Sequence, residues 1–202
     1  MTLSTCRKPH LAEKIVMVGG LDGCGKTLFS PIISALDRVE LPTYSYEIEH
    51  YCSLYFLQKL SLQSASTLIR MQTDLKLYNT MMGREVNFRP TDLSSVQMFH
   101  SPTQYFERLF QPGDETIPDV INKNNPILNL IIHNVLFISD PIWNALGSRC
   151  IYIEVIRHPL YMVRQQHLNM QKLIDDVRDF IIYYERGGKS YPYWTEGWED
   201  LF

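Results

Sequence analysis

A glycine-rich segment near the start of the chain has the residue types and the spacing of an anion-binding loop. It reads GLDGCGKT from Gly20 to Thr27 and satisfies the pattern G-x-x-x-x-G-K-[ST] in full. Glycines allow successive backbone N–H groups to point at one anion, the following helix adds the positive end of its dipole, and Lys26 adds a mobile cation. The residues expected to bind a phosphate or phosphosulfate chain are Gly20, Asp22, Gly23, Cys24, Gly25, Lys26, Thr27 and Leu28.

Three side chains of this loop have a further interpretation. Thr27 would contact the anion, or a magnesium ion if the reaction uses one. Asp22 could accept the proton of an acceptor hydroxyl, although capping a turn within the loop is the simpler interpretation. Cys24 is interpreted as a small residue tolerated beside the anion rather than as a redox switch.

The segment EVIRHPLYMVRQQ, residues 154–166, predicts a second anion site, with Arg157 as its cation; the alternative is that Arg157 forms a surface ion pair. A buried strand is expected to end at Arg157, and Pro159 suits the first turn of the next helix. Ligands of open α/β sheets bind at the carboxyl ends of the strands, so we expect Arg157 to contact the same ligand as the loop. Arg164 lies two helical turns further on and faces either that pocket or solvent.

Charged side chains also follow the second predicted strand, in PTYSYEIEHY at residues 42–51. On a strand, Glu47 and Glu49 share one face and His50 lies on the other. Transfer of a group to a hydroxyl requires a base that removes the proton, and we rank Glu49 first, His50 second and Glu47 third for that role. The alternative is that all three are solvated charges at the end of a strand.

Apolar periodicity and turn residues predict strands that alternate with helices along the chain. Such alternation is typical of a single α/β domain, here residues 1–202, with three layers and a mainly parallel central sheet. Strands are expected at 15–18, 39–51, within 129–140 and at 150–156, helices at 27–36, 54–82, 101–110 and from Pro159 to Gly187, and loops at 84–97 and 111–126.

The charge, hydropathy and cysteine content of the chain argue against nucleic acid and membranes as partners. The 202 residues carry a net charge of −3 with no basic run, so a nucleic-acid-binding surface is not expected. The apolar stretch at 126–138 contains polar residues and is too short to span a bilayer, so no membrane association is expected. The four cysteines form no C-x-x-C pair, which favours a reduced, cytoplasmic compartment. The oligomeric state, and whether the domain continues beyond residue 202, stay open.

Two segments together resemble the sulfotransferase family: the strand, loop and helix within residues 14–51, and the strand, Arg-x-Pro segment and helix within residues 127–168. The resemblance implies a P-loop NTPase-like fold and transfer of a sulfuryl group from 3′-phosphoadenosine 5′-phosphosulfate to a hydroxyl or amine of a small-molecule acceptor, without a metal ion. It implies that residues 23–28 grip the 5′-phosphosulfate and that Arg157 grips the 3′-phosphate. Lys26 would stabilise charge on the bridging oxygen as the bond breaks.

Two positions differ from the family pattern. Lys26 stands where the family usually has a hydroxyl residue, and Gln165 stands where it has a serine, although the amide of Gln165 can still donate to a phosphate. The loop is also similar to that of nucleoside and nucleotide kinases, thymidylate kinase especially, which implies ATP with Mg²⁺ and places Thr27 and Asp140 near the metal. A nucleotide-binding module without turnover is the third interpretation. The Arg-x-Pro segment favours the sulfotransferase.

Overall fold

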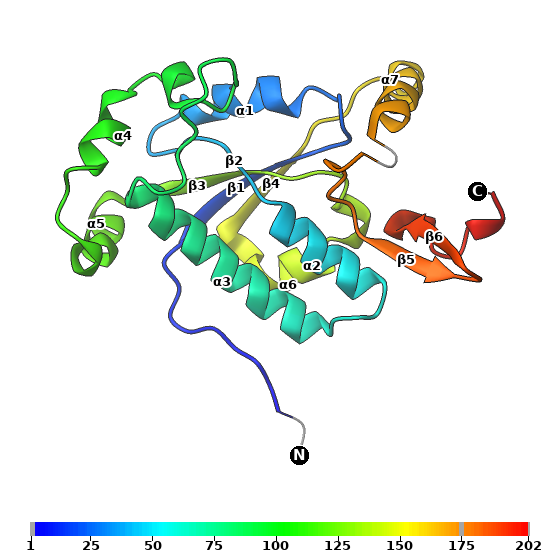
Figure 1. The fold of residues 1–202 in the computed structure, drawn as a ribbon. Coiled ribbons are helices and arrows are strands. Elements are labelled where there is room, and N and C mark those ends of the chain that lie inside the picture. Colours follow the sequence, from blue (N-terminus) through cyan, green and yellow to red (C-terminus); the bar gives the residue numbers. More distant parts are fainter. Residues whose placement is uncertain (1–2, 174–175, 202) are drawn as a thin grey trace.

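The computed structural model describes residues 3–173 and 176–201. Its centre is a four-stranded parallel sheet in the order β2-β3-β1-β4 (Figure 1). Because the strands run in the same direction, their carboxyl ends emerge at a single edge. The strands are β1 (Lys14–Gly19), β2 (Thr43–Tyr44), β3 (Ile127–Ile131) and β4 (Cys150–Glu154).

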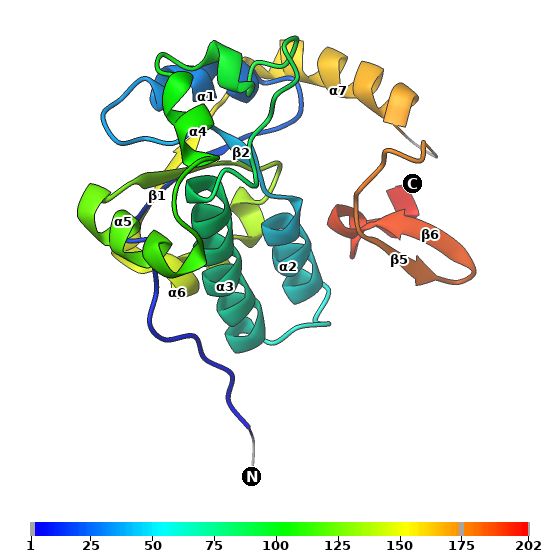
Figure 2. The ribbon, with the colours of Figure 1, turned by 60° about the vertical axis from the view of Figure 1, so that its left-hand side comes forward.

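Helices cover both faces of the sheet, so the protein is α/β, as the sequence predicts (Figure 1 and Figure 2). One face carries α1 (Lys26–Ser34), and the other carries α2 (Tyr46–Phe56), α3 (Leu62–Met81) and α6 (Asp140–Leu146). The remaining elements are α4 (Thr103–Arg108), α5 (Ile117–Asn124), α7 (Pro159–Leu173) and an antiparallel hairpin of β5 (Tyr183–Arg186) and β6 (Lys189–Pro192). Within the described residues, no helix has the length and hydropathy needed to cross a bilayer.

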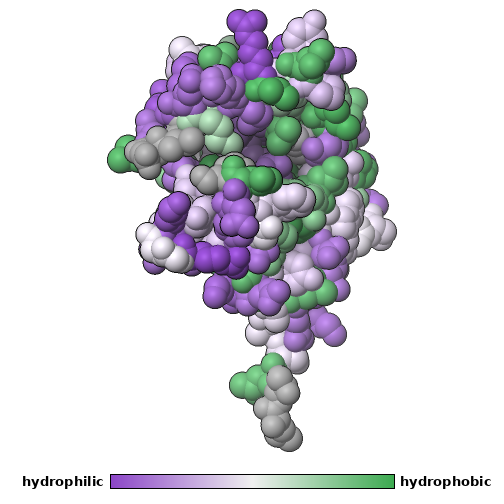
Figure 3. Space-filling view, turned by 90° about the vertical axis from the view of Figure 1, so that its right-hand side faces the viewer, coloured by the Kyte–Doolittle hydropathy of each residue, from purple (hydrophilic) through white to green (hydrophobic). Residues whose placement is uncertain are grey.

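The carboxyl edge of the sheet lies on the right of Figure 1, next to α7 and the hairpin. Figure 3 faces this side and shows hydrophilic and hydrophobic surface interspersed over it. A mixed surface of this kind offers both polar and apolar contacts to a ligand.

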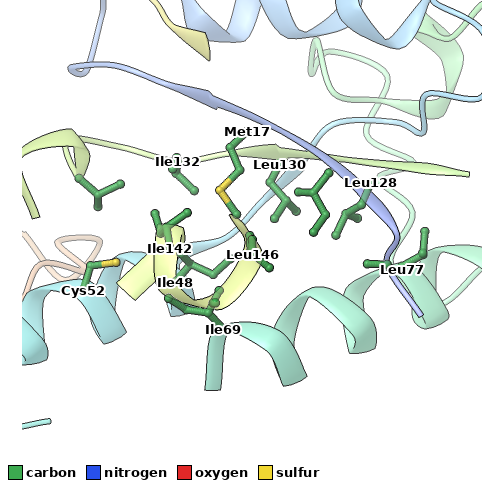
Figure 4. Close-up of a cluster of buried hydrophobic side chains, with 14 of the residues drawn as sticks. Met17, Ile48, Cys52, Ile69, Leu77, Leu128, Leu130, Ile132, Ile142 and Leu146 are labelled. Atoms are coloured by element: carbon green, nitrogen blue, oxygen red, sulfur yellow. The ribbon is translucent and has the colours of Figure 1, made fainter. Parts of the chain in front are cut away.

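The main core lies between the sheet and helices α2, α3 and α6. β1 and β3 read KIVMVG and ILNLI, nearly continuous apolar runs that are expected of parallel strands covered on both faces. Met17 and Leu130 of these strands pack with Ile48, Ile69 and Ile142 of the three helices, and all five are fully buried (Figure 4). Burial of each large apolar side chain contributes about 1.5–3 kcal/mol to folding.

Several predicted elements are confirmed. The strand at 15–18, the helix after the glycine-rich loop and a helix within 101–110 are all present. The strand predicted at 150–156 is present but shorter, because β4 ends at Glu154, three residues before Arg157, and its residues are half-buried or exposed rather than buried. Pro159 opens α7 as predicted, because its fixed φ suits the first helical turn.

The predicted strand at 39–51 is wrong over most of its length. Only Thr43 and Tyr44 form a strand, and α2 begins at Tyr46. Glu47 and Glu49 fall in the first turn of α2, where carboxylates interact favourably with the helix dipole, and this preference outweighs the β-forming aromatic residues around them. The two glutamates therefore lie on a helix, and their expected arrangement on one face of a strand does not occur.

Four other expectations need correction. The helix predicted at 54–82 is two helices, because Gln58 adopts a positive φ of 57° and Ser61 caps α3 through Ser64 N–H. The loop predicted at 111–126 contains α5, which has Pro118 in its first turn. β3 stops at Ile131, a short 3-10 helix covers Leu136–Ile138, and α6 begins at Asp140. The helix predicted to reach Gly187 gives way to the hairpin, in which Gly187 forms the turn.

Candidate functional site

The segments that follow the four parallel strands meet at the carboxyl edge of the sheet. The glycine-rich loop follows β1, α2 follows β2, the segment from Ile132 follows β3, and Arg157 follows β4. In open α/β sheets, this edge is where ligands bind. The predicted loop and the predicted arginine therefore lie on the same side of the molecule.

The loop has the backbone geometry of an anion site. Gly25 has a φ of 111° and precedes α1 without a side-chain cap, so the first helical N–H groups are left open. The N–H groups of Gly25, Lys26 and Thr27 donate to no acceptor in the part of the chain that the structure describes. A side chain at Gly20 would lie 2.6 Å from Cys24 Sγ and 2.7 Å from the carbonyl oxygen of Val155, so this close approach requires glycine.

Lys26 lies inside the loop rather than in solvent. Its side chain is only 4% exposed, and its Nζ donates to the carbonyl oxygens of Gly20 at 2.9 Å and Leu21 at 3.1 Å. Asp22 Oδ1 lies 3.6 Å from the same nitrogen. Thr27 Oγ1 lies 3.2 Å from the hydroxyl of Tyr44 at the end of β2. An ammonium group and a hydroxyl are thus both held next to the open amides.

Side chains from the start of α7 and the segment before it hold the tip of the loop. Arg157 Nη1 donates to the carbonyl of Gly23 at 3.3 Å, so the structure places this arginine against the loop. Gln166 Nε2 donates to the carbonyl of Asp22 at 2.7 Å, and Asn169 Nδ2 donates to it at 3.4 Å. Gln165 packs so closely on Gly23 that a side chain there would lie 2.4 Å from its Cγ.

A histidine that the sequence reasoning missed lies beside the loop. His133 Nδ1 is 2.8 Å from Glu49 Oε1, and its backbone N–H donates to the same oxygen at 2.9 Å. His133 Nε2 is 3.4 Å from Asp22 Oδ1. The imidazole is nearly parallel to the rings of Tyr44 and Tyr46, with centroid distances of 5.8 and 5.5 Å. These contacts fix both the position and the plane of the imidazole.

This arrangement suits proton transfer at Nε2. A carboxylate only accepts hydrogen bonds, so Nδ1 carries a proton in its close contact with Glu49, and Nε2, whose contact with Asp22 is longer, is the nitrogen that can exchange a proton. Glu49 lies in the site as predicted, but its geometry is that of a group that orients His133.

Glu47 and His50, the other two residues predicted as a general base, contact groups outside the loop. Glu47 Oε1 lies 3.5 Å from the buried Lys76 Nζ, and Glu47 Oε2 accepts from the hydroxyl of Ser45. The ring of His50 contacts the carbonyl of Phe180 at 2.6 Å through Nε2. Neither contact is to the glycine-rich loop or to His133.

Three more sequence candidates have a definite place. Asp140 is exposed and opens α6, so the expectation that it ends a strand is wrong. Leu28 is 67% exposed on α1 and points to solvent rather than into the core. Cys24 is buried with a free thiol and packs under Gly20, which agrees with its interpretation as a small residue of the loop.

Glu154 is a further carboxyl at this edge that the sequence reasoning missed. It ends β4 opposite Gly19 of β1, and the hydroxyl of Tyr152 donates to it at 3.1 Å. Burial raises its pKa above the ordinary value, although the Tyr152 hydrogen bond and the charge of Lys26 act in the opposite direction. The carboxyl is therefore partly desolvated next to the loop.

We compared the chain with protein-family models, curated proteins and solved structures, and none of the three comparisons found a match. The interpretation of the site therefore depends on its residues and their geometry.

Proposed function

We propose that this protein transfers a sulfuryl group from 3′-phosphoadenosine 5′-phosphosulfate to a hydroxyl or amine of a small-molecule acceptor, and that its fold is of the P-loop type. The observation that carries the proposal is the contact of Arg157 Nη1 with the carbonyl of Gly23 at 3.3 Å. It brings a guanidinium next to loop amides for which the described residues supply no acceptor. A nucleotide with an anionic group at both its 3′ and 5′ positions would use both elements.

The residues present fit the two anionic ends of this donor. The N–H groups of Gly25, Lys26 and Thr27 would bind the 5′-phosphosulfate, since open amides at a helix N-terminus favour an anion. Lys26 would exchange its two carbonyl contacts for donor oxygens. Arg157 is exposed, and its planar guanidinium suits bidentate binding of the 3′-phosphate.

His133 is the residue we assign as the general base. The acceptor oxygen forms a bond to sulfur while its proton passes to Nε2 of His133. The bond from sulfur to the 5′-phosphate oxygen breaks, its electron pair stays on that oxygen, and Lys26 stabilises the negative charge. The products are the sulfated acceptor and adenosine 3′,5′-bisphosphate. Glu49 accepts a hydrogen bond from Nδ1 and so holds the imidazole in place.

Phosphoryl transfer from ATP is the second candidate, favoured by the pair Lys26 and Thr27 at the end of the loop. It needs Mg²⁺, for which Thr27 and Asp140 are the residues expected from the sequence. The Thr27 hydroxyl lies in the loop, 3.2 Å from the hydroxyl of Tyr44, whereas Asp140 begins α6. This candidate gives no role to the contact between Arg157 and the loop.

Turnover distinguishes the two candidates. The protein is incubated in EDTA with 3′-phosphoadenosine 5′-phosphosulfate and a pool of phenol, sugar and amine acceptors, and sulfated products and adenosine 3′,5′-bisphosphate are measured by mass spectrometry. We expect both products with the wild type and neither with Lys26→Ala. Transfer from ATP in Mg²⁺, with none from the phosphosulfate donor, would overturn the proposal in favour of the kinase.

A further inference from the structure

Asp22 has a position that the proposed chemistry does not use. Its Oδ1 lies 3.6 Å from Lys26 Nζ and 3.4 Å from His133 Nε2, so one carboxylate oxygen lies between the two groups assigned to the leaving and the attacking oxygens. The transferred group must pass between the same two groups. We propose that Asp22 is a specificity-determining residue that favours a singly charged sulfuryl group over a doubly charged phosphoryl group. This inference rests on the proposed function.

The backbone of Asp22 is held, so the carboxylate cannot easily leave this region. Gln166 and Asn169 of α7 both donate to the carbonyl of Asp22, at 2.7 and 3.4 Å. Arg157 holds the next carbonyl, that of Gly23. The side chain of Asp22 is 48% exposed, so it can turn away from Lys26 when an anion binds there, but it stays at the edge of the site.

The charge of the transferred group decides how strongly this carboxylate opposes it. A terminal sulfuryl group carries one negative charge, whereas a terminal phosphate carries about −1.5 to −2 at pH 7. At a given distance, the Coulomb repulsion between the carboxylate and the transferred group is proportional to the charge of that group. The repulsion by Asp22 therefore reduces the binding free energy of a phosphoryl donor by up to about twice as much as that of a sulfuryl donor. The protein would consequently bind the sulfuryl donor in preference to the phosphoryl donor.

A matched pair of ligands tests this directly. 3′-Phosphoadenosine 5′-phosphosulfate and 3′-phosphoadenosine 5′-diphosphate share one skeleton and differ in the terminal group. Their dissociation constants are measured by calorimetry in EDTA at pH 7.5 without acceptor, for the wild type and for Asp22→Asn, which keeps the shape and removes the charge. We expect the wild type to prefer the phosphosulfate and Asp22→Asn to reduce that preference about tenfold.

Asp37→Asn is the matched control, because it removes the same charge from a side chain that is 93% exposed beyond the C-terminal end of α1. It should leave the ratio of the two dissociation constants unchanged. If Asp22→Asn does not fold, Asp22→Ser removes the same charge and replaces it in the test.

The possible outcomes distinguish a failure of this inference from a failure of the proposed function. A wild type that binds the phosphosulfate in EDTA, with a ratio that Asp22→Asn leaves unchanged, overturns only the role of Asp22. A wild type that binds neither ligand in EDTA overturns the proposed function and this inference with it. A reduced ratio in Asp22→Asn, with an unchanged ratio in Asp37→Asn, supports the role of Asp22.

Discussion

The two ends of the parallel sheet hold carboxylates and cations in opposite ways. At the amino end, Glu40 and Arg108 are both buried and form a bidentate pair with distances of 2.7 and 2.8 Å, and the hydroxyl of Tyr105 donates to the same carboxylate at 2.7 Å. At the carboxyl end, the half-exposed Asp22 lies 3.6 Å from Lys26 and 3.4 Å from His133. Glu40 is thus closely paired at the amino end, whereas Asp22 is loosely paired at the carboxyl end, beside the closer contact of Glu49 with His133 at 2.8 Å.

The difference distinguishes a cluster whose polar groups satisfy one another from an edge of the sheet that keeps open hydrogen-bond donors. In the amino-end cluster, Arg108 also donates to the carbonyl of Thr80, and the Tyr105 oxygen also accepts from the N–H of Leu41. Burial and the neighbouring Glu40 raise the pKa of Tyr105 well above its ordinary value, so it remains a hydroxyl donor. At the carboxyl end, the N–H groups of Gly25, Lys26 and Thr27 donate to no acceptor among the described residues.

The largest expected effect is on the amino-end cluster. Arg108→Ala leaves the buried Glu40 carboxylate without its cation, so we expect the free energy of unfolding to fall by about 3–5 kcal/mol in urea titrations. Arg89→Ala, at a side chain that is 80% exposed, should change it by less than about 0.5 kcal/mol. Equal stability of the two variants would contradict the comparison.

At the carboxyl end, His133→Ala should affect turnover rather than folding. We expect kcat to fall by about 10²- to 10⁴-fold, the range for loss of a general base. The dissociation constant of adenosine 3′,5′-bisphosphate should stay within about threefold, because His133 faces the acceptor. Glu49→Gln should give a smaller loss of kcat. A His133→Ala variant that loses nucleotide binding and stability together would mean that the histidine is structural.

The arginine beside the loop should discriminate between nucleotides. Arg157→Ala is expected to raise the dissociation constant of adenosine 3′,5′-bisphosphate about tenfold in calorimetry, since a charge-assisted contact to the 3′-phosphate is lost. Adenosine 5′-monophosphate lacks that phosphate, so its affinity should not change. Lys172→Ala, at an exposed residue in the last turn of α7, serves as the control. If Arg157→Ala weakened the binding of both nucleotides equally, Arg157 would not be the residue that binds the 3′-phosphate.

The smallest effect concerns the pH dependence of stability at Glu154. Its pKa is raised from 4.5 in the folded protein, so the folded state binds this proton more tightly than the unfolded chain. The resulting stability is present below pH 4.5 and is lost as the pH rises through the folded value.

Glu154→Gln cannot ionise, so the variant should not lose stability as the pH rises. Its Tm should equal that of the wild type at pH 4 and exceed it by about 1–2 °C at pH 7. The exposed Glu107→Gln should show no such change between the two pH values. A Tm difference for Glu154→Gln that is the same at both pH values would contradict a raised pKa.

Local sequence was sufficient for the parts of the site that lie on one continuous segment. The order of strand, glycine-rich loop and helix is encoded within residues 14–34, and the Arg157–Pro159 junction is encoded by the strand before it and the proline. Both follow from backbone preferences of neighbouring residues. For that reason the order of the elements and the start of α7 at Pro159 are predicted correctly, whereas the end of β4 at Glu154 and its partial exposure are not.

The pairing of Glu49 with His133 could not be predicted in this way. It joins residues 84 positions apart, and it depends on α2 starting directly after a two-residue strand. The aromatic residues around Tyr44 favoured a longer strand, which would have turned Glu49 to a different side. One signal was present: His133 directly follows the buried run LNLII at residues 128–132, at the end where parallel strands place ligands.

The most direct test of the central claim is a thermal-shift measurement with two ligands. The account predicts that adenosine 3′,5′-bisphosphate in EDTA, at a hundredfold excess over its dissociation constant, raises the Tm by about 5–10 °C. Lys26→Ala should abolish that shift. A Tm that rises only with ATP and Mg²⁺, and not with the bisphosphate in EDTA, would contradict the account.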